Sequence, residues 1–146
     1  MDVELLKKHT KYSGGLNEES RRIKFFWDIM RELPEIDRLK IIRFCWGQER
    51  LPINSEEFER NNIRFMIKPM VASNRNQDQS LPKADTCFFN IELPDYSSKA
   101  IMKEKILLAV NLDNVSINAD ENIYNDDNPL MNELGTYEQD SYNEGE

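Results

Sequence analysis

The chain has 146 residues, which predicts a single domain with enough apolar material for one core. No stretch has the length or purity of a membrane span, and no apolar leader follows Met1. We therefore expect a soluble protein without membrane contact, located in the cytoplasm and also in the nucleus. Two cysteines without secretory context predict free thiols, and a single histidine leaves too few ligands for a zinc-like cluster. We expect neither a metal nor a cofactor.

The net charge of −8 is divided unevenly along the chain. Residues 1–110 carry 19 basic and 17 acidic side chains, whereas residues 111–146 carry ten acidic and no basic ones. An acidic tail competes with phosphates for basic side chains, so nucleic acid is not an expected partner. Because the tail is rich in Asn, Asp, Glu and Ser, we expect residues 112–146 to be disordered.

Two helices are predicted in the first third of the chain, after a turn or hinge at Gly14–Gly15. Asn17 is the expected N-cap of the first helix, which Pro34 ends. The second helix begins near Glu35 and stops at Gly47. Helical spacing predicts that the following apolar side chains face the core: Ile23, Phe26, Trp27 and Met30 in the first helix, and Leu39, Ile42 and Trp46 in the second.

The remainder predicts two strands and a third helix. Residues 49–58 indicate a loop, and the alternation of Ile63, Phe65 and Ile67 predicts a strand with one buried face. After a polar loop over residues 72–80, a short strand is expected to begin near Thr86. Ser97 or Ser98 caps a last helix that ends near Val110, with an apolar stripe of Met102, Ile106, Ala109 and Val110. The order of elements predicts a compact α+β domain of helices packed on a small sheet.

Cys87 lies in the segment LPKADTCFFNIELPDY, after polar Asp85 and Thr86 and before Phe88–Phe89. We expect the cysteine at the edge of a strand that the phenylalanines anchor, with its thiol open to solvent. On local sequence alone, a small buried hydrophobe is an equally good interpretation of Cys87. Cys45, between Phe44 and Trp46, is expected to pack in or near the core.

A cysteine protease is the competing enzyme class, and it needs a histidine base within reach of the thiol. His9 is the only histidine, and it lies in a basic segment beside the predicted hinge. A surface or packing role for His9 is the better interpretation, so we reject the protease. Thioester exchange needs no histidine base, because one thiolate displaces another and bond energies nearly cancel.

The segment around Cys87 resembles the cysteine motif of HECT-type ubiquitin ligases, and it looks most like the large HERC-type members. KKHTKYSGGL upstream and LPDYSSKAIMKEKILLAV downstream extend the resemblance over about residues 3–110. The commonest form of the motif has histidine at the position of Asp85. A carboxylate beside a thiol disfavours the thiolate, whereas a protonated histidine favours it.

The resemblance implies a HECT C-lobe: residues 1–15 as a hinge segment, 16–111 as the catalytic domain and 112–146 as the acidic tail. It implies that Cys87 accepts ubiquitin as a thioester from a ubiquitin-conjugating enzyme and passes it to a lysine of a protein substrate. Asp85 is a candidate for orienting or deprotonating that lysine, and Thr86 for bonding the carbonyl or the thiolate. A solvated loop carboxylate and an ordinary strand threonine are equally good interpretations of these two residues.

The larger N-lobe, which docks the conjugating enzyme in this family, is missing from the 146 residues. Two alternatives therefore stay open. In the first alternative, the chain is a catalytically silent ubiquitin-binding module that retains the fold. In the second, it is a truncated fragment whose Cys87 is rarely loaded with ubiquitin. A scaffold whose acidic tail recruits partners is a third, weaker interpretation.

Overall fold

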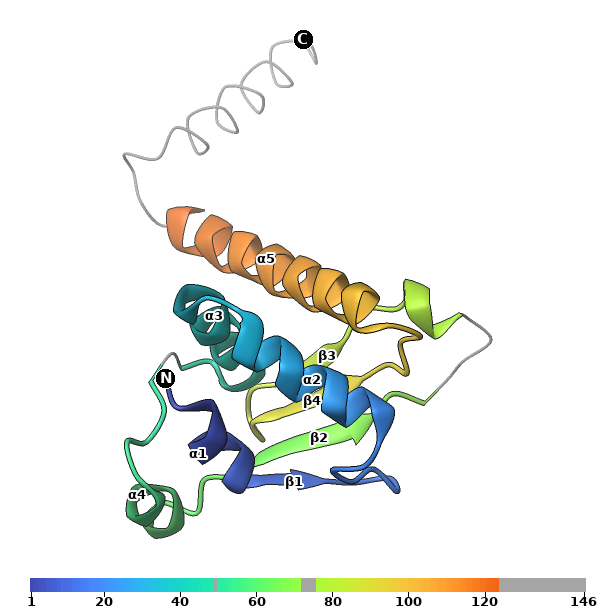
Figure 1. The fold of residues 1–146 in the computed structure, drawn as a ribbon. Helices are drawn as coiled ribbons and strands as arrows, with labels where there is room; N and C mark the ends of the chain where they lie inside the picture. Colours follow the sequence, from blue (N-terminus) through green and yellow to red (C-terminus); the bar gives the residue numbers. More distant parts are fainter. Residues whose placement is uncertain (49, 72–75, 124–146) are drawn as a thin grey trace, which may run out of the picture. The chain divides into compact units, whose positions relative to one another are not determined.

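The computed structural model of the protein describes residues 1–48, 50–71 and 76–123. Within these residues, five α-helices, four strands and one short 3-10 helix form an α+β fold, as predicted (Figure 1). In chain order the elements are α1 (Val3–Lys8), β1 (Thr10–Tyr12), α2 (Arg21–Glu32), α3 (Glu35–Trp46), α4 (Ser55–Arg60), β2 (Phe65–Pro69), η1 (Gln77–Gln79), β3 (Lys83–Asp85), β4 (Asn90–Leu93) and α5 (Lys99–Ile123).

The strands form one mixed sheet in the order β1-β2-β4-β3. Strands β1, β2 and β4 are parallel, and Ile67 of β2 pairs with Ile91 of β4. Strand β3 is antiparallel to β4, with Asp85 opposite Asn90, and it forms one edge of the sheet. The sheet therefore ends in a β3–β4 hairpin whose connecting residues include Cys87.

One face of the sheet carries the core. Phe65 and Ile67 of β2 are buried, whereas Met66 and Lys68 between them are half-buried, as the alternation predicts. Figure 1 shows α2, α3 and the first turns of α5 on the same side of the sheet. The predicted apolar faces of the first and last helices are confirmed, because each of these side chains is buried: Ile23, Phe26, Trp27, Met30, Met102, Ile106, Ala109 and Val110.

The second helix matches its predicted bounds, and Gly47 ends it with a left-handed φ of 79°. Its predicted face is only partly correct, because Leu39 and Trp46 are half-buried while Ile41, Ile42 and Cys45 are the buried residues. For the first helix, the predicted N-cap Asn17 is wrong. The helix begins after Ser20, and the Asn17 side chain instead accepts a hydrogen bond from the Glu19 amide at 2.8 Å.

Several elements differ from prediction. Helix α1 and the strands β1 and β3 were not expected, η1 lies in the predicted polar loop of residues 72–80, and α4 lies within and just beyond the loop predicted for residues 49–58. The Asn54 side chain caps α4 by accepting from the Glu57 amide at 2.9 Å. Helix α5 continues from Val110 to Ile123, where disorder was expected from residue 112. No proline or glycine interrupts α5, and once a helix has started each added residue adds a backbone bond.

Residues Met1–Asn111 form one compact unit, and a second unit begins at Leu112. Within the first unit, residues 1–15 are built into the fold: Leu6 is fully buried and β1 pairs with β2. The predicted hinge in this segment stays a prediction. The disorder predicted for residues 124–146 lies outside the described residues. In the described part of the chain, none of the helices has both the length and the apolar character needed to cross a bilayer.

Candidate active site

Cys87 is exposed on the turn formed by residues 86–89, which connects β3 to β4. The prediction of a strand from near Thr86, with Cys87 at its edge, is wrong, because β4 begins only at Asn90. Hydrogen bonding within the turn competes successfully with strand pairing at these four residues. The thiol therefore projects from the end of a hairpin, which leaves it more accessible than a strand position would.

Asp85 holds this turn together. Its Oδ1 accepts a hydrogen bond from the Cys87 amide at 3.1 Å, and its carbonyl accepts from the Phe88 amide at 3.1 Å. The Asp85 amide donates to Oδ1 of Asn90 at 3.2 Å. An aspartate whose side chain accepts from the amide two residues ahead forms an Asx turn. Asp85 therefore has a structural role in the turn, and its role toward a lysine stays a prediction.

The two phenylalanines after Cys87 have opposite environments. Phe88 is 72% exposed, whereas Phe89 is 3% exposed. The Phe89 ring stacks on Trp46 at a centroid distance of 4.7 Å and lies 4.9 Å from the Phe65 ring. Phe89 adopts a left-handed φ of 46°, which is costly for a bulky residue and is maintained by this packing. The predicted anchoring by both rings is therefore wrong, because Phe89 alone anchors the turn.

Thr86 is exposed beside the end of helix α3. A Cβ atom placed on Gly47 would lie 3.6 Å from Cβ of Thr86, so the turn rests against the helix end. Asn90 was missed by the sequence analysis. It is the buried polar residue at the start of β4, and an asparagine directly after two phenylalanines is the signal that marks it.

Cys45 has the opposite environment to Cys87. It is fully buried in α3, as predicted, and burial raises the pKa of its thiol. Two effects therefore protect Cys45 from thiol reagents: the core excludes the reagent, and the raised pKa keeps the thiol protonated although the thiolate is the reactive form.

We expect iodoacetamide to modify Cys87 alone in the native protein and both cysteines in 8 M urea. Mass spectrometry of the intact chain checks this through one added carbamidomethyl group before unfolding and two after it. A Cys87→Ala variant that still gains a group under native conditions would contradict the assignment of the exposed thiol.

His9 is engaged in packing. Its ring stacks on Phe58 at 4.4 Å, with the two rings 3° from parallel, and Nε2 lies 3.1 Å from Oγ of Ser55. These contacts link α1 and β1 to α4 and agree with the packing role expected for the single histidine. Among the described residues, no group of three or more His, Cys, Asp or Glu side chains is placed to hold a metal ion.

The fold and the site together define an α+β domain that presents an exposed cysteine on a hairpin turn. Residues 1–115 match the HECT-domain (ubiquitin-transferase) family. The chain belongs to the HECT-domain family, which confirms the resemblance found in the sequence.

Three relatives illustrate the match. The chain is 33% identical over 108 residues to human E3 ubiquitin-protein ligase HERC2, and 34% identical over 113 residues to E3 ubiquitin-protein ligase RSP5 of Saccharomyces cerevisiae. It is 32% identical over 111 residues to E3 ubiquitin-protein ligase HUL5 of the same yeast. These alignments cover 74%, 75% and 76% of the chain but only 2%, 13% and 11% of the respective relatives.

Proposed function

We propose that this chain is the C-terminal catalytic lobe of a HECT-type ubiquitin ligase and that Cys87 forms its thioester intermediate. The observation that carries the proposal is the turn itself: an exposed thiol whose backbone is fixed by Asp85 and by the buried ring of Phe89. A fixed nucleophile in solvent suits acyl exchange between large partners, because positioning supplies much of the rate. The proposed catalytic domain, residues 16–111, lies within the compact unit Met1–Asn111, and residues 1–15 are its proposed hinge segment.

In the first step, the Cys87 thiolate attacks the thioester carbonyl at the C-terminus of ubiquitin carried by a conjugating enzyme. A carbon–sulfur bond to Cys87 forms, the bond to the donor cysteine breaks, and the donor leaves as a thiolate that takes a proton from solvent. No oxidant or reductant is consumed.

In the second step, an amine of a substrate lysine attacks the same carbonyl. A carbon–nitrogen bond forms, the amine loses a proton, and Cys87 leaves as a thiolate. We assign proton acceptance to the Asp85 carboxylate, whose Oδ1 already fixes the turn, and stabilisation of the carbonyl oxygen to the Thr86 hydroxyl.

The partners in this proposal are ubiquitin, a conjugating enzyme bound through an N-lobe outside these residues, and a protein substrate. The names of the relatives support ubiquitin as the transferred group, and the chain spans only a small part of their length. We propose a cytoplasmic or nuclear location, where reducing conditions keep the Cys87 thiol free.

The test uses the full chain and a ubiquitin thioester of a small thiol, which removes the need for an N-lobe. We expect a ubiquitin adduct that reducing agent cleaves, and no adduct with Cys87→Ala. Cys87→Ser should form either no adduct or one that reducing agent does not cleave. A second arm, with an N-lobe in cis and charged conjugating enzyme, should give the same adduct faster.

An adduct that persists in Cys87→Ala, or none in the wild type in either arm, would refute the proposal. The silent ubiquitin-binding module would then be favoured if ubiquitin titration shifts the same amide resonances in the wild type and in Cys87→Ala.

A further inference from the structure

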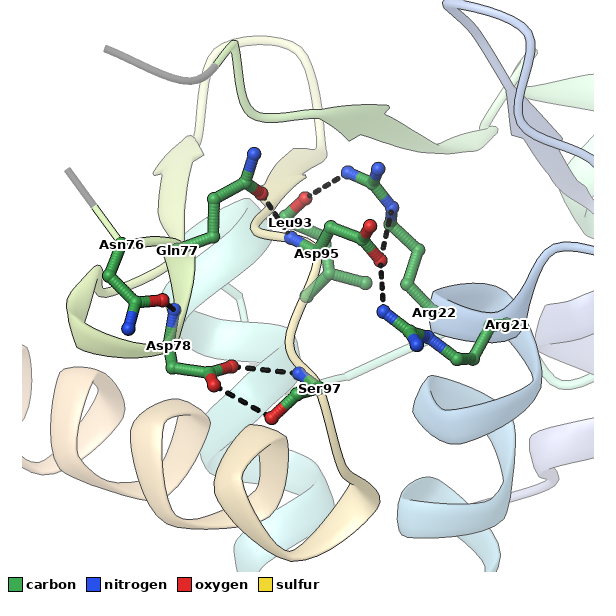
Figure 2. Close-up of polar contacts among 8 residues, drawn as sticks. All are labelled: Arg21, Arg22, Asn76, Gln77, Asp78, Leu93, Asp95 and Ser97. Carbon is green, nitrogen blue, oxygen red and sulfur yellow. Dashed lines mark hydrogen bonds and ion pairs between the residues drawn. The ribbon is translucent and has the colours of Figure 1, made fainter. Parts of the chain in front are cut away.

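The two chain segments that flank the Cys87 hairpin are tied together at its open end (Figure 2). Residues 76–80 precede β3, and residues 94–97 follow β4. The Asp78 carboxylate accepts two hydrogen bonds from Ser97, one from the amide to Oδ1 and one from Oγ to Oδ2, both at 2.7 Å. These bonds favour the ionised carboxylate and lower the pKa of Asp78 below its usual range.

Further contacts surround the Asp78–Ser97 pair. The Asp78 amide donates to Oδ1 of Asn76 at 3.0 Å, which fixes the backbone that carries the carboxylate. The buried Tyr96 donates its hydroxyl to the Ser80 carbonyl at 2.6 Å, and Gln77 Oε1 accepts from the Asp95 amide. The two segments are therefore joined at three successive points.

This tie is itself held by helix α2. Arg21 and Arg22 both reach Asp95, at 3.3 Å and 3.6 Å, and Arg22 also donates to the Leu93 carbonyl at 2.9 Å (Figure 2). Exposed ion pairs of this kind each contribute little to the stability of the fold. The hydrogen bond from Arg22 to the Leu93 carbonyl, in contrast, is part-buried and holds the last residue of β4. The open end of the hairpin is thus fixed to the body of the domain.

The hairpin needs such support because β3 is short and lies at an edge. It has three residues, two of them exposed, and it pairs with β4 alone. Strand β4 is held on its other edge by β2, whereas β3 has β4 as its only partner among the described strands. The turn that carries Cys87 follows directly from β3, so the contacts at the open end and those of Asp85 and Phe89 hold opposite ends of the same strand pair.

We propose that Asp78 is a positioning residue for the Cys87 reaction: through Ser97 it fixes the hairpin in the orientation in which the thiol meets the thioester carbonyl. This inference rests on the proposed function of Cys87 and assigns a role to a residue that takes no part in the bond changes. Small displacements of a nucleophile lower the maximal rate more than they lower substrate affinity, since the partner binds elsewhere.

The first experiment compares the full wild-type chain with Asp78→Ala, Asp78→Asn and the exposed α4 variant Glu56→Ala. Adduct formation with the ubiquitin small-thiol thioester is followed at increasing concentrations, at a temperature where circular dichroism shows every variant to be folded. We expect Asp78→Ala to lower the maximal rate by about tenfold. The half-saturating concentration should change by less than about twofold, and Glu56→Ala should match the wild type.

Asparagine is the conservative variant, because its amide can accept from the Ser97 amide and donate to the Ser97 hydroxyl. We expect Asp78→Asn to recover most of the maximal rate. Three results would overturn the proposal. The first is an unchanged maximal rate in Asp78→Ala with only a lower unfolding midpoint, and the second is a loss of maximal rate in Asp78→Asn equal to that in Asp78→Ala. The third is a change in the half-saturating thioester concentration without a change in the maximal rate.

A second measurement tests the proposal without ubiquitin. In Asp78→Ala, amide hydrogen exchange at Cys87 and Phe88, both bonded to Asp85, should accelerate by about tenfold. Phe65 in β2, whose amide donates to the His9 carbonyl at 3.2 Å and not to the turn, should keep its rate. Unchanged exchange in the turn would overturn the positioning role even if no adduct forms. Absence of a wild-type adduct with altered exchange would instead count against the proposed function alone.

Discussion

Replacing Phe89 with alanine is expected to destabilise the domain by about 3–5 kcal/mol, the cost of deleting a buried aromatic ring. The ring is 3% exposed and fills the space between Trp46 and Phe65. Alanine keeps a Cβ atom, so the strain of the left-handed backbone at this position is unchanged and only the lost packing is measured. Urea unfolding followed by far-UV circular dichroism gives the midpoint and slope for this comparison.

Phe88→Ala is the matched control, because it removes the same ring one residue away. Because Phe88 is 72% exposed, the free energy of unfolding of the Phe88→Ala variant should stay within about 0.5 kcal/mol of the wild-type value. The native Cys87 turn should survive in this variant and be lost in Phe89→Ala. Equal losses in the two variants would contradict the description of Phe89 as the one phenylalanine ring that anchors the turn.

Gly14→Ala is the second substitution with a large expected effect. Gly14 has a φ of 63°, where an alanine costs about 1–2 kcal/mol. An added Cβ would also lie 2.4 Å from Cγ and 2.8 Å from Cδ of Pro69, the last residue of β2. Relieving this overlap requires movement of β2, which pairs with both β1 and β4, so overpacking adds about 1–3 kcal/mol.

Gly15→Ala separates the two contributions. Gly15 has a similar φ of 83°, but no atom lies within 4 Å of an added Cβ. Its cost should therefore be about 1–2 kcal/mol, from the backbone alone. Thermal unfolding of both variants by calorimetry gives the difference, and a Gly15→Ala loss as large as that of Gly14→Ala would show that the contact with Pro69 is unimportant.

The long elements could be predicted because their signals are local. Helical spacing of Ile23, Phe26 and Trp27 repeats over several turns, and the alternation around Phe65 marks β2. Strand β1 could not be found, because three residues in a parallel pair leave no periodic pattern. Helix α4 has a single buried residue, Phe58, but its capping pattern of Asn54 with Glu57 was a usable signal that was overlooked.

The geometry of the candidate site could not be predicted from the sequence, and the roles of its residues stay predictions. The motif indicated Cys87, Asp85 and Thr86 as a group, and the structure brings them together at one turn. The tendency of aromatic residues to form strands suggested that Phe88 continues β4. The Asx turn at Asp85 is a local bond between neighbouring residues, for which an aspartate is a usable signal. The left-handed Phe89, in contrast, depends on its tertiary contact with Trp46, which no local pattern encodes.

The pairing order of the sheet has a consequence for how the protein is made. Strand β4 pairs with β2, β2 pairs with β1, and Ser97 beyond β4 is bonded to Asp78 before the hairpin. These contacts join segments far apart in sequence, and such contacts slow folding because the chain between them must first be brought together. A chain that leaves the ribosome from its N-terminus exposes Cys87 before β4 and the first turns of α5 are available. The thiol therefore acquires its working surroundings only when synthesis of the domain is nearly complete.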